Sequence, residues 1–114
     1  MKTAVLYYAS PNGTNVIREF ILSLEKRQQA KVRRIFQAIT EYGLSSILPH
    51  TKKLTGTPLW EIRILGGDNI RVIYVVPLVN TVLVLHGFIK KTQKTPPREL
   101  LIAQHRLDDW QKNH

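Results

Sequence analysis

Cysteine is absent from this chain of 114 residues, and both acidic residues and long apolar runs are scarce. Without cysteine the chain forms no disulfide and has no thiolate nucleophile. The longest apolar run, residues 72–79, is interrupted by Pro77 and is too short to cross a bilayer. The first eight residues lack the apolar core of a signal peptide. We therefore expect a cytoplasmic protein that does not associate with membranes.

Basic residues outnumber acidic ones by 17 to 8, which gives a formal net charge of +9. Such an excess favours a polyanionic partner, such as nucleic acid, an acidic protein or a membrane surface. Plain solubility is the alternative, but the charges are grouped rather than scattered. Between Lys90 and Arg98 the chain carries four positive charges and no negative one, directly after an apolar segment. A cationic loop at the rim of a sheet is a place to hold phosphate.

The spacing of apolar residues alternates between the periods of strands and helices. The length fits a single domain over residues 1–114. The predicted elements are a strand over 2–9, a helical hairpin over 14–42, irregular chain over 44–58, strands over 59–65, 70–76 and 81–89, and a final helix capped by Thr95 with Pro96 at its first position. Short turns between the last three strands indicate antiparallel pairing, with 81–89 as the central strand. We therefore predict an α+β domain with its helices on one face of a twisted sheet.

Most standard catalytic machinery is missing from the sequence. No Gly-rich phosphate loop of the Walker or dinucleotide type occurs, and no serine lies in a nucleophile elbow. The four histidines show no spacing typical of a metal site. Asp108 and Asp109 are adjacent on a predicted helix, so their side chains point about 100° apart and suit a solvated helix end. We expect neither a metal nor a cofactor.

Cations on the predicted sheet are the remaining candidates for a site. Arg63 and Arg71 fall on the two strands of one hairpin. A four-residue turn would place them on opposite faces, whereas a three- or five-residue turn or a bulge would place them on the same face. We predict the same face, with Glu61 beside them and away from the core, and with Lys90 and Lys91 arriving from the next strand. The other predicted phosphate ligands are Lys52, Lys53 and Lys94.

Converging lysine and arginine side chains suit RNA for two reasons. They neutralise backbone phosphates, and they stabilise charge that develops on a phosphate in a transition state. RNA carries its own nucleophile, the 2′-hydroxyl, so such a cleft could act without a metal. On this hypothesis Arg63, Arg71, Lys91 and His86 are the candidate catalytic residues, while Lys52, Lys53, Lys90 and Lys94 bind RNA.

Two of these residues have competing interpretations. Arg63 could instead form an exposed salt bridge with Glu61 or Asp68, worth less than ~1 kcal/mol. His86 is a candidate general base because the unperturbed pKa of a histidine side chain suits proton transfer. Its neighbours Leu85 and Gly87 favour a hydrogen-bonded core or rim position instead.

Three segments together resemble the phage-derived HigB-like toxins of the RelE/ParE superfamily of bacterial toxin–antitoxin systems. They read LWEIR at 59–63, RVIY at 71–74, and LHGFIKKTQKTP at 85–96. The last of these is the most specific, and the resemblance extends over nearly the whole chain.

The resemblance implies a small type II toxin that cuts mRNA in the ribosomal A site and is inhibited by a HigA-like helix-turn-helix antitoxin in a hetero-oligomer. By position, Arg63, Arg71, and Lys90 or Lys91 match the basic residues that RelE-like toxins use for RNA. Some RelE-like toxins place a catalytic tyrosine near the C-terminus, whereas here no tyrosine follows Tyr74. The ParE branch inhibits DNA gyrase, so gyrase inhibition stays open as an alternative, as does plain RNA binding.

Overall fold

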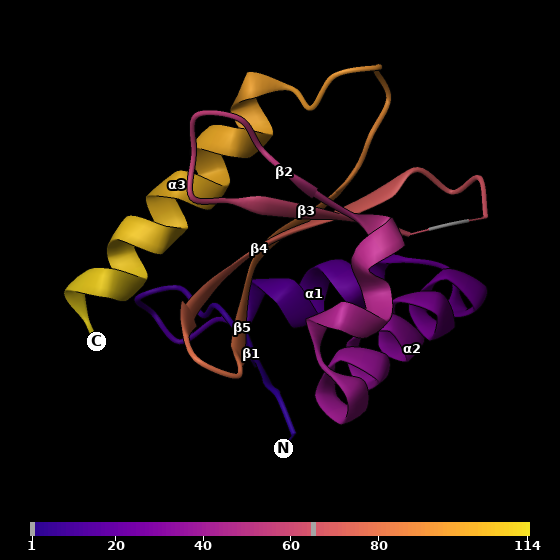
Figure 1. Ribbon diagram of the computed structural model, residues 1–114. Helices are drawn as coiled ribbons and strands as arrows, with labels where there is room; N and C mark the ends of the chain where they lie inside the picture. The colour runs from indigo at the N-terminus through magenta and orange to yellow at the C-terminus, as the bar shows by residue number, and fades with distance from the viewer. Residues whose placement is uncertain (1, 65) are drawn as a thin grey trace.

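The computed structural model describes residues 2–64 and 66–114 (Figure 1). The predicted strand end at Leu65 therefore lies outside the described residues. In chain order the elements are β1 (Ala4–Tyr7), α1 (Val16–Ser23), α2 (Lys26–Tyr42), the 3₁₀ helix η1 (Leu44–His50), β2 (Thr51–Lys53), β3 (Trp60–Ile64), β4 (Ile70–Leu78), β5 (Thr81–Ile89) and α3 (Pro97–Lys112).

The strands form one five-stranded sheet in the order β1-β5-β4-β3-β2. β1 pairs with β5 in parallel, and all other neighbours are antiparallel. The predicted α+β class and the antiparallel pairing of the last three strands are confirmed. The central strand is β4 rather than β5, because the short strand β2 adds to the far edge within a segment that was expected to be irregular.

Residues with known capping preferences lie at the start of α1 and at the end of α2. Asn15 caps α1, with its side-chain oxygen accepting a hydrogen bond of 3.0 Å from the backbone N–H of Arg18. Gly43 ends α2 at a φ of 82°, a left-handed backbone conformation that side chains disfavour. Asn15 thus marks the start of α1 and Gly43 the end of α2, and these two helices cover one face of the sheet.

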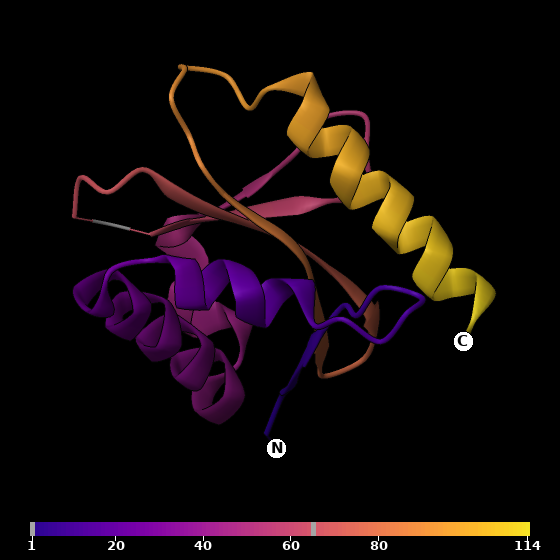
Figure 2. The ribbon, with the colours of Figure 1, turned by 180° about the vertical axis from the view of Figure 1, so that it is seen from behind.

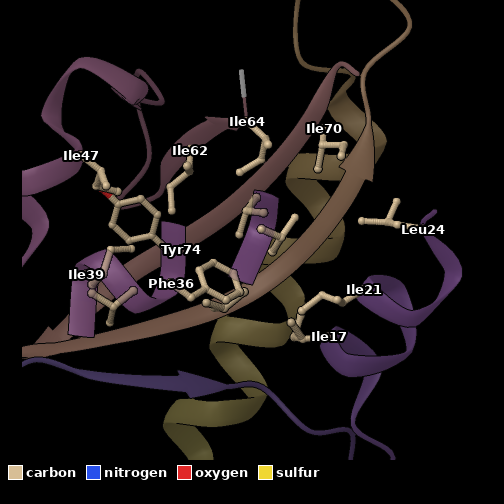
Figure 3. Packing of buried hydrophobic residues seen from close by; sticks show 14 residues of the cluster. Ile17, Ile21, Leu24, Phe36, Ile39, Ile47, Ile62, Ile64, Ile70 and Tyr74 are labelled. Carbon is tan, nitrogen blue, oxygen red and sulfur yellow. The ribbon is translucent and has the colours of Figure 1, made fainter. Parts of the chain in front are cut away.

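One hydrophobic core lies between that face and the helices α1, α2 and η1. Figure 3 shows Ile17 and Ile21 of α1, with Phe36 of α2, directed toward the strands. From the sheet side, the core receives alternate residues of β3 and β4: Ile62, Ile64, Ile70, Val72 and Tyr74. This alternation is the one expected of strands with one face toward these helices.

A second core lies on the opposite face of the sheet, beneath α3. Ala103 and Leu107 of α3 pack there with Ile73 of β4 and with Leu83 and Leu85 of β5. Figures 1 and 2 show α3 on the other side of the sheet from α1 and α2. The prediction that all helices cover one face is therefore wrong. The central strands carry apolar residues on both faces, and so each face needs cover.

One local prediction also needs correction. Pro96 occupies the N-cap position of α3 and Pro97 its first turn, so Thr95 does not cap this helix. On the other side of the sheet, Arg27 and Lys31 of α2 bind the carboxylate of Asp68 at 3.1 and 2.6 Å. Within the described part of the chain, no helix combines the length and apolarity needed to cross a membrane.

Candidate nucleic-acid interface

An open cleft of about 510 Å³ lies where β5 runs into the loop that leads to α3. It occupies the α3 face of the sheet, toward the end that carries the β3–β4 turn. Its lining is almost wholly polar and comes from three strands, the turn and the loop. The lining residues are Lys52, Arg63, Asn69, Arg71, Lys90, Lys91, Thr92 and Gln93.

Strand register brings the two arginines together. Arg63 of β3 and Arg71 of β4 are directly opposite each other, so their side chains share one face. Ile64 pairs with Ile70, which leaves five residues between the strands and confirms the predicted same-face placement. Like charges directly opposite one another destabilise a sheet. A bound anion between the two guanidinium groups would relieve this repulsion.

The lysines reach the cleft from its two sides. Lys52 of β2 lies opposite Glu61 of β3 and so shares the arginine face. The backbone N–H of Lys90 donates a hydrogen bond of 2.7 Å to the carbonyl of Asn69, which joins the end of β5 to the β3–β4 turn. Figures 1 and 2 show this turn and the loop after β5 at the same end of the sheet. Lys90 and Lys91 therefore enter the cleft opposite Lys52.

Glu61 lies beneath the cleft, with only 3% of its surface exposed. As predicted, it shares the face of Arg63 and points away from the core beneath α1 and α2, but α3 and the preceding loop cover this face, so Glu61 is buried. Its Oε1 lies 3.4 Å from Arg71 Nε, and its Oε2 accepts a hydrogen bond of 2.5 Å from Thr95 Oγ1. Burial lowers the pKa of Arg71; the charge of Glu61 opposes this shift and nearby Arg63 adds to it.

Most of the cleft cations have no acidic partner. Among the described residues, no carboxylate lies within ion-pair distance of Lys52, Arg63, Lys90 or Lys91. The alternative of a salt bridge from Arg63 to Glu61 or Asp68 is therefore not realised. These positive charges stay available to an external anion.

Two predicted RNA ligands do not line the cleft. Lys53 lies on the opposite face of β2, with its ammonium nitrogen 5.7 Å from the centre of the Trp60 ring. Lys94 is exposed farther along the loop, where its carbonyl accepts a hydrogen bond of 2.7 Å from Thr92 Oγ1. Only Lys52 and Lys90 of the four predicted RNA-binding lysines belong to the cleft.

His86 is buried and is not among the residues that line the cleft. Its Nδ1 is 3.2 Å from Arg106 Nη1, and because a guanidinium only donates, this nitrogen must accept. Its Nε2 therefore carries the hydrogen and donates it to Glu99 Oε1 at 2.7 Å. Burial lowers the pKa of His86, although its hydrogen bond to Glu99 opposes this shift. The structure thus agrees with the hydrogen-bonded core interpretation, not with a base in the cleft.

The uncharged residues of the cleft were not predicted from the sequence, because the cleft was predicted from its charged residues alone. Asn69 sits in the β3–β4 turn at a positive φ of 57°, a conformation asparagine tolerates better than most residues. Thr92 and Gln93 follow the lysine pair. Their position in the loop between Lys91 and Lys94 was the sequence feature that pointed to them as cleft residues.

The cleft is suited to holding an extended polyanion. Its five cations come from separate strands and a loop, and their side chains include two arginines able to bind phosphate through paired N–H groups. Among the described residues, no group of three or more His, Cys, Asp or Glu side chains is placed to hold a metal ion.

A mixed sheet with two N-terminal helices on one face and a C-terminal helix on the other is consistent with the RelE-like class of α+β domains. Within that class, residues 19–108 match the family described as Phage derived protein Gp49-like (DUF891), so the chain belongs to this family. The family is related to toxins of the RelE and HigB type. No curated protein matches the chain.

Proposed function

We propose that this protein is the toxin of a type II toxin–antitoxin pair, a cytoplasmic endoribonuclease that cuts mRNA on the ribosome. The observation that carries the proposal is the cleft in which Arg63 and Arg71 oppose each other, flanked by Lys52, Lys90 and Lys91. Membership of the Gp49-like family supports it, since that family is related to RelE/HigB-type toxins.

The proposed reaction uses the RNA as its own nucleophile. The 2′-oxygen attacks the adjacent phosphorus, the bond from phosphorus to the 5′-oxygen breaks, and a cyclic phosphate and a 5′-hydroxyl result. Arg63 and Arg71 stabilise the charge that develops on the phosphate. The 2′-hydroxyl proton passes to water, and the ammonium group of Lys91 donates a proton to the leaving oxygen.

Inducible expression in bacteria, followed by primer extension on cellular transcripts, tests this proposal. The wild-type protein should arrest growth and create new 5′ ends within coding regions. Arg63→Ala is the cleanest variant because Arg63 has no carboxylate partner among the described residues. It should keep the fold and reduce cleavage by about 10²-fold or more. Arg71→Ala should do the same, although it also leaves Glu61 without its cation.

The matched control is Lys112→Ala, which removes one positive charge at the exposed end of α3. It should remain fully toxic. A folded Arg63→Ala protein that still arrests growth and cuts transcripts would refute the assignment. Supercoiling defects and DNA damage without new transcript ends would instead indicate a gyrase inhibitor.

One observation favours a second candidate function, RNA binding without cleavage. None of the described residues that line the cleft is a histidine, a carboxylate or a tyrosine, the usual groups for proton transfer near neutral pH. In this case the purified protein and ribosomes would bind RNA but leave it intact.

The proposed partner is a HigA-like helix-turn-helix antitoxin with an acidic surface. A net charge of +9 favours such a partner, which would cover the cationic cleft or a nearby helix. Expression together with a small helix-turn-helix protein from the adjacent reading frame should restore growth and abolish the new transcript ends.

A further inference from the structure

Glu61 is a buried charge that the proposed reaction does not use. Among the described strand residues it is the only acidic one, and it lies directly beneath a cleft that would bind an anion. A buried carboxylate is costly unless it is paired and hydrogen-bonded, and its negative charge opposes phosphate binding. Its position therefore needs a reason other than direct contact with RNA.

The two oxygens of Glu61 connect parts of the chain that are far apart in sequence. Oε1 faces Arg71 Nε at 3.4 Å, and Oε2 accepts from the hydroxyl of Thr95 at 2.5 Å. Thr95 ends the loop that begins at Lys90, whose backbone N–H is bonded to Asn69. The loop is thus fixed at both ends, and the residues between those ends include the cleft-lining Lys91.

Arg71 forms an ion pair with the same carboxylate. Its Nη1 donates a hydrogen bond of 3.2 Å to the carbonyl of Ile70, while its buried Nε lies 3.4 Å from Glu61 Oε1 in an ion pair that is not a hydrogen bond. The Arg71 side chain is only 12% exposed. Of its five N–H groups, those on Nη2 and the second on Nη1 stay available to an anion.

We propose that Glu61 is a positioning residue that acts as a latch, holding the Arg71 guanidinium and the loop over residues 90–95 in the arrangement that binds RNA. The latch consists of Glu61, Arg71 and Thr95. This inference rests on the proposed function in that the cleft binds an RNA backbone. If Glu61 only neutralised Arg71, its contact with Thr95 would have no effect on RNA binding.

The loop side of the latch is tested with Thr95→Val, which keeps the side-chain shape and removes the donor. Amide hydrogen exchange in residues 90–95 should accelerate about tenfold or more, because a hydrogen bond to a charged group is lost. Affinity for a single-stranded oligoribonucleotide with 2′-O-methyl sugars, which cannot be cut by its own 2′-oxygen, should fall by a similar factor. Thr95→Ser keeps the hydroxyl and should behave as wild type.

Thr40→Val is the matched control for a general loss of stability. It removes the hydroxyl that bonds the Phe36 carbonyl in α2, far from the latch in the fold. It should leave both the exchange of residues 90–95 and the RNA affinity unchanged. Exchange that rises equally over the whole chain in Thr95→Val would indicate global destabilisation and would overturn the proposal.

The arginine side of the latch is tested with Glu61→Gln. The amide oxygen can still accept from Thr95, but its NH₂ group then faces the N–H of Arg71. The NMR signal of Arg71 Nε should shift, and RNA affinity should fall severalfold although the Thr95 contact is kept. An unchanged Arg71 signal in this variant would contradict the latch.

The readouts separate failure of the latch from failure of the proposed function. If the wild-type protein does not bind the oligoribonucleotide, the proposed function fails, and the latch is judged by exchange and the Arg71 signal alone. If the wild type binds and Thr95→Val binds equally well with a wild-type exchange pattern, the latch is wrong and the proposed function stands.

Discussion

At the residue scale, charge that is paired and charge that is free have different roles in this protein. Asp68 lies in the β3–β4 turn and binds Arg27, Gln28 and Lys31 of α2, so it anchors the turn next to the cleft. Arg63, five positions earlier, has no carboxylate partner among the described residues. The chain thus fixes the turn with one acid and leaves the neighbouring guanidinium open to an external anion.

Asp68 predicts a specific dependence of stability on pH. The hydrogen bond from Lys31, with those from Arg27 and Gln28, outweighs burial and lowers the pKa of Asp68 to about 2 from 3.8. Because the pKa is lower in the folded state, the stabilisation is present above about pH 3.8 and is lost as the pH falls toward 2. Asp68→Asn should therefore lower the free energy of unfolding at pH 7, and the difference from wild type should shrink as the pH falls from about 3.8 through about 2.

Urea denaturation across this pH range measures the effect. Glu41→Gln, which changes an exposed carboxylate at the end of α2, is the control and should show no such convergence. A difference between wild type and Asp68→Asn that is constant with pH would show that Asp68 is not held as described.

At the element scale, the joint between β5 and α3 depends on His86. The neutral ring donates to Glu99 and accepts from Arg106, both on α3, and Arg106 also donates to the carbonyl of Leu85 at 2.9 Å. Because α3 begins directly after the loop that contributes Lys90 and Lys91 to the cleft, this joint fixes the position of the Thr95 end of the loop. His86 therefore supports the site without entering it.

The joint should weaken in mild acid. The pKa of His86 is lower in the folded protein than its ordinary value of 6.5, so the unfolded chain takes up the proton first. The free energy of unfolding should fall as the pH drops below about 6.5, by at most about 1.4 kcal/mol per pH unit. His86→Gln should flatten this slope between pH 7 and 5. His105→Gln, at an exposed position of α3, should retain it; equal slopes in all three proteins would contradict the assignment.

Helices and strands with clear apolar periodicity could be predicted from the sequence. The packing of α3 against the sheet could not. Alternation in β3 and β4 and the five-residue turn placed Arg63 and Arg71 on one face. The strand β2 was missed because three residues carry no readable period. The face covered by α3 was missed because helical spacing shows which side of a helix is buried, not which face of the sheet it meets. The burial of Glu61 follows from that same unpredicted contact.

At the scale of the whole molecule, some basic side chains hold parts of the fold together and others line the cleft. Arg27 and Lys31 stabilise the turn, Arg106 supports the β5–α3 joint, and five others line one cleft. Composition predicted an anionic partner, and the sheet register and the loop after β5 gather five of the cations at one cleft. Neighbouring lysines of β2 illustrate the point, since Lys52 faces the cleft and Lys53 faces Trp60.

The most direct test of the central claim, that the cleft binds an RNA backbone, is the salt dependence of affinity for a single-stranded oligoribonucleotide. Each lost phosphate contact should reduce the slope of log K against log salt by about 0.7. Lys52→Gln and Arg63→Gln should each show this reduction, whereas Lys53→Gln, on the other face of the same strand, should keep the wild-type slope. Equal slopes for Lys52→Gln, Lys53→Gln and the wild-type protein would contradict the account.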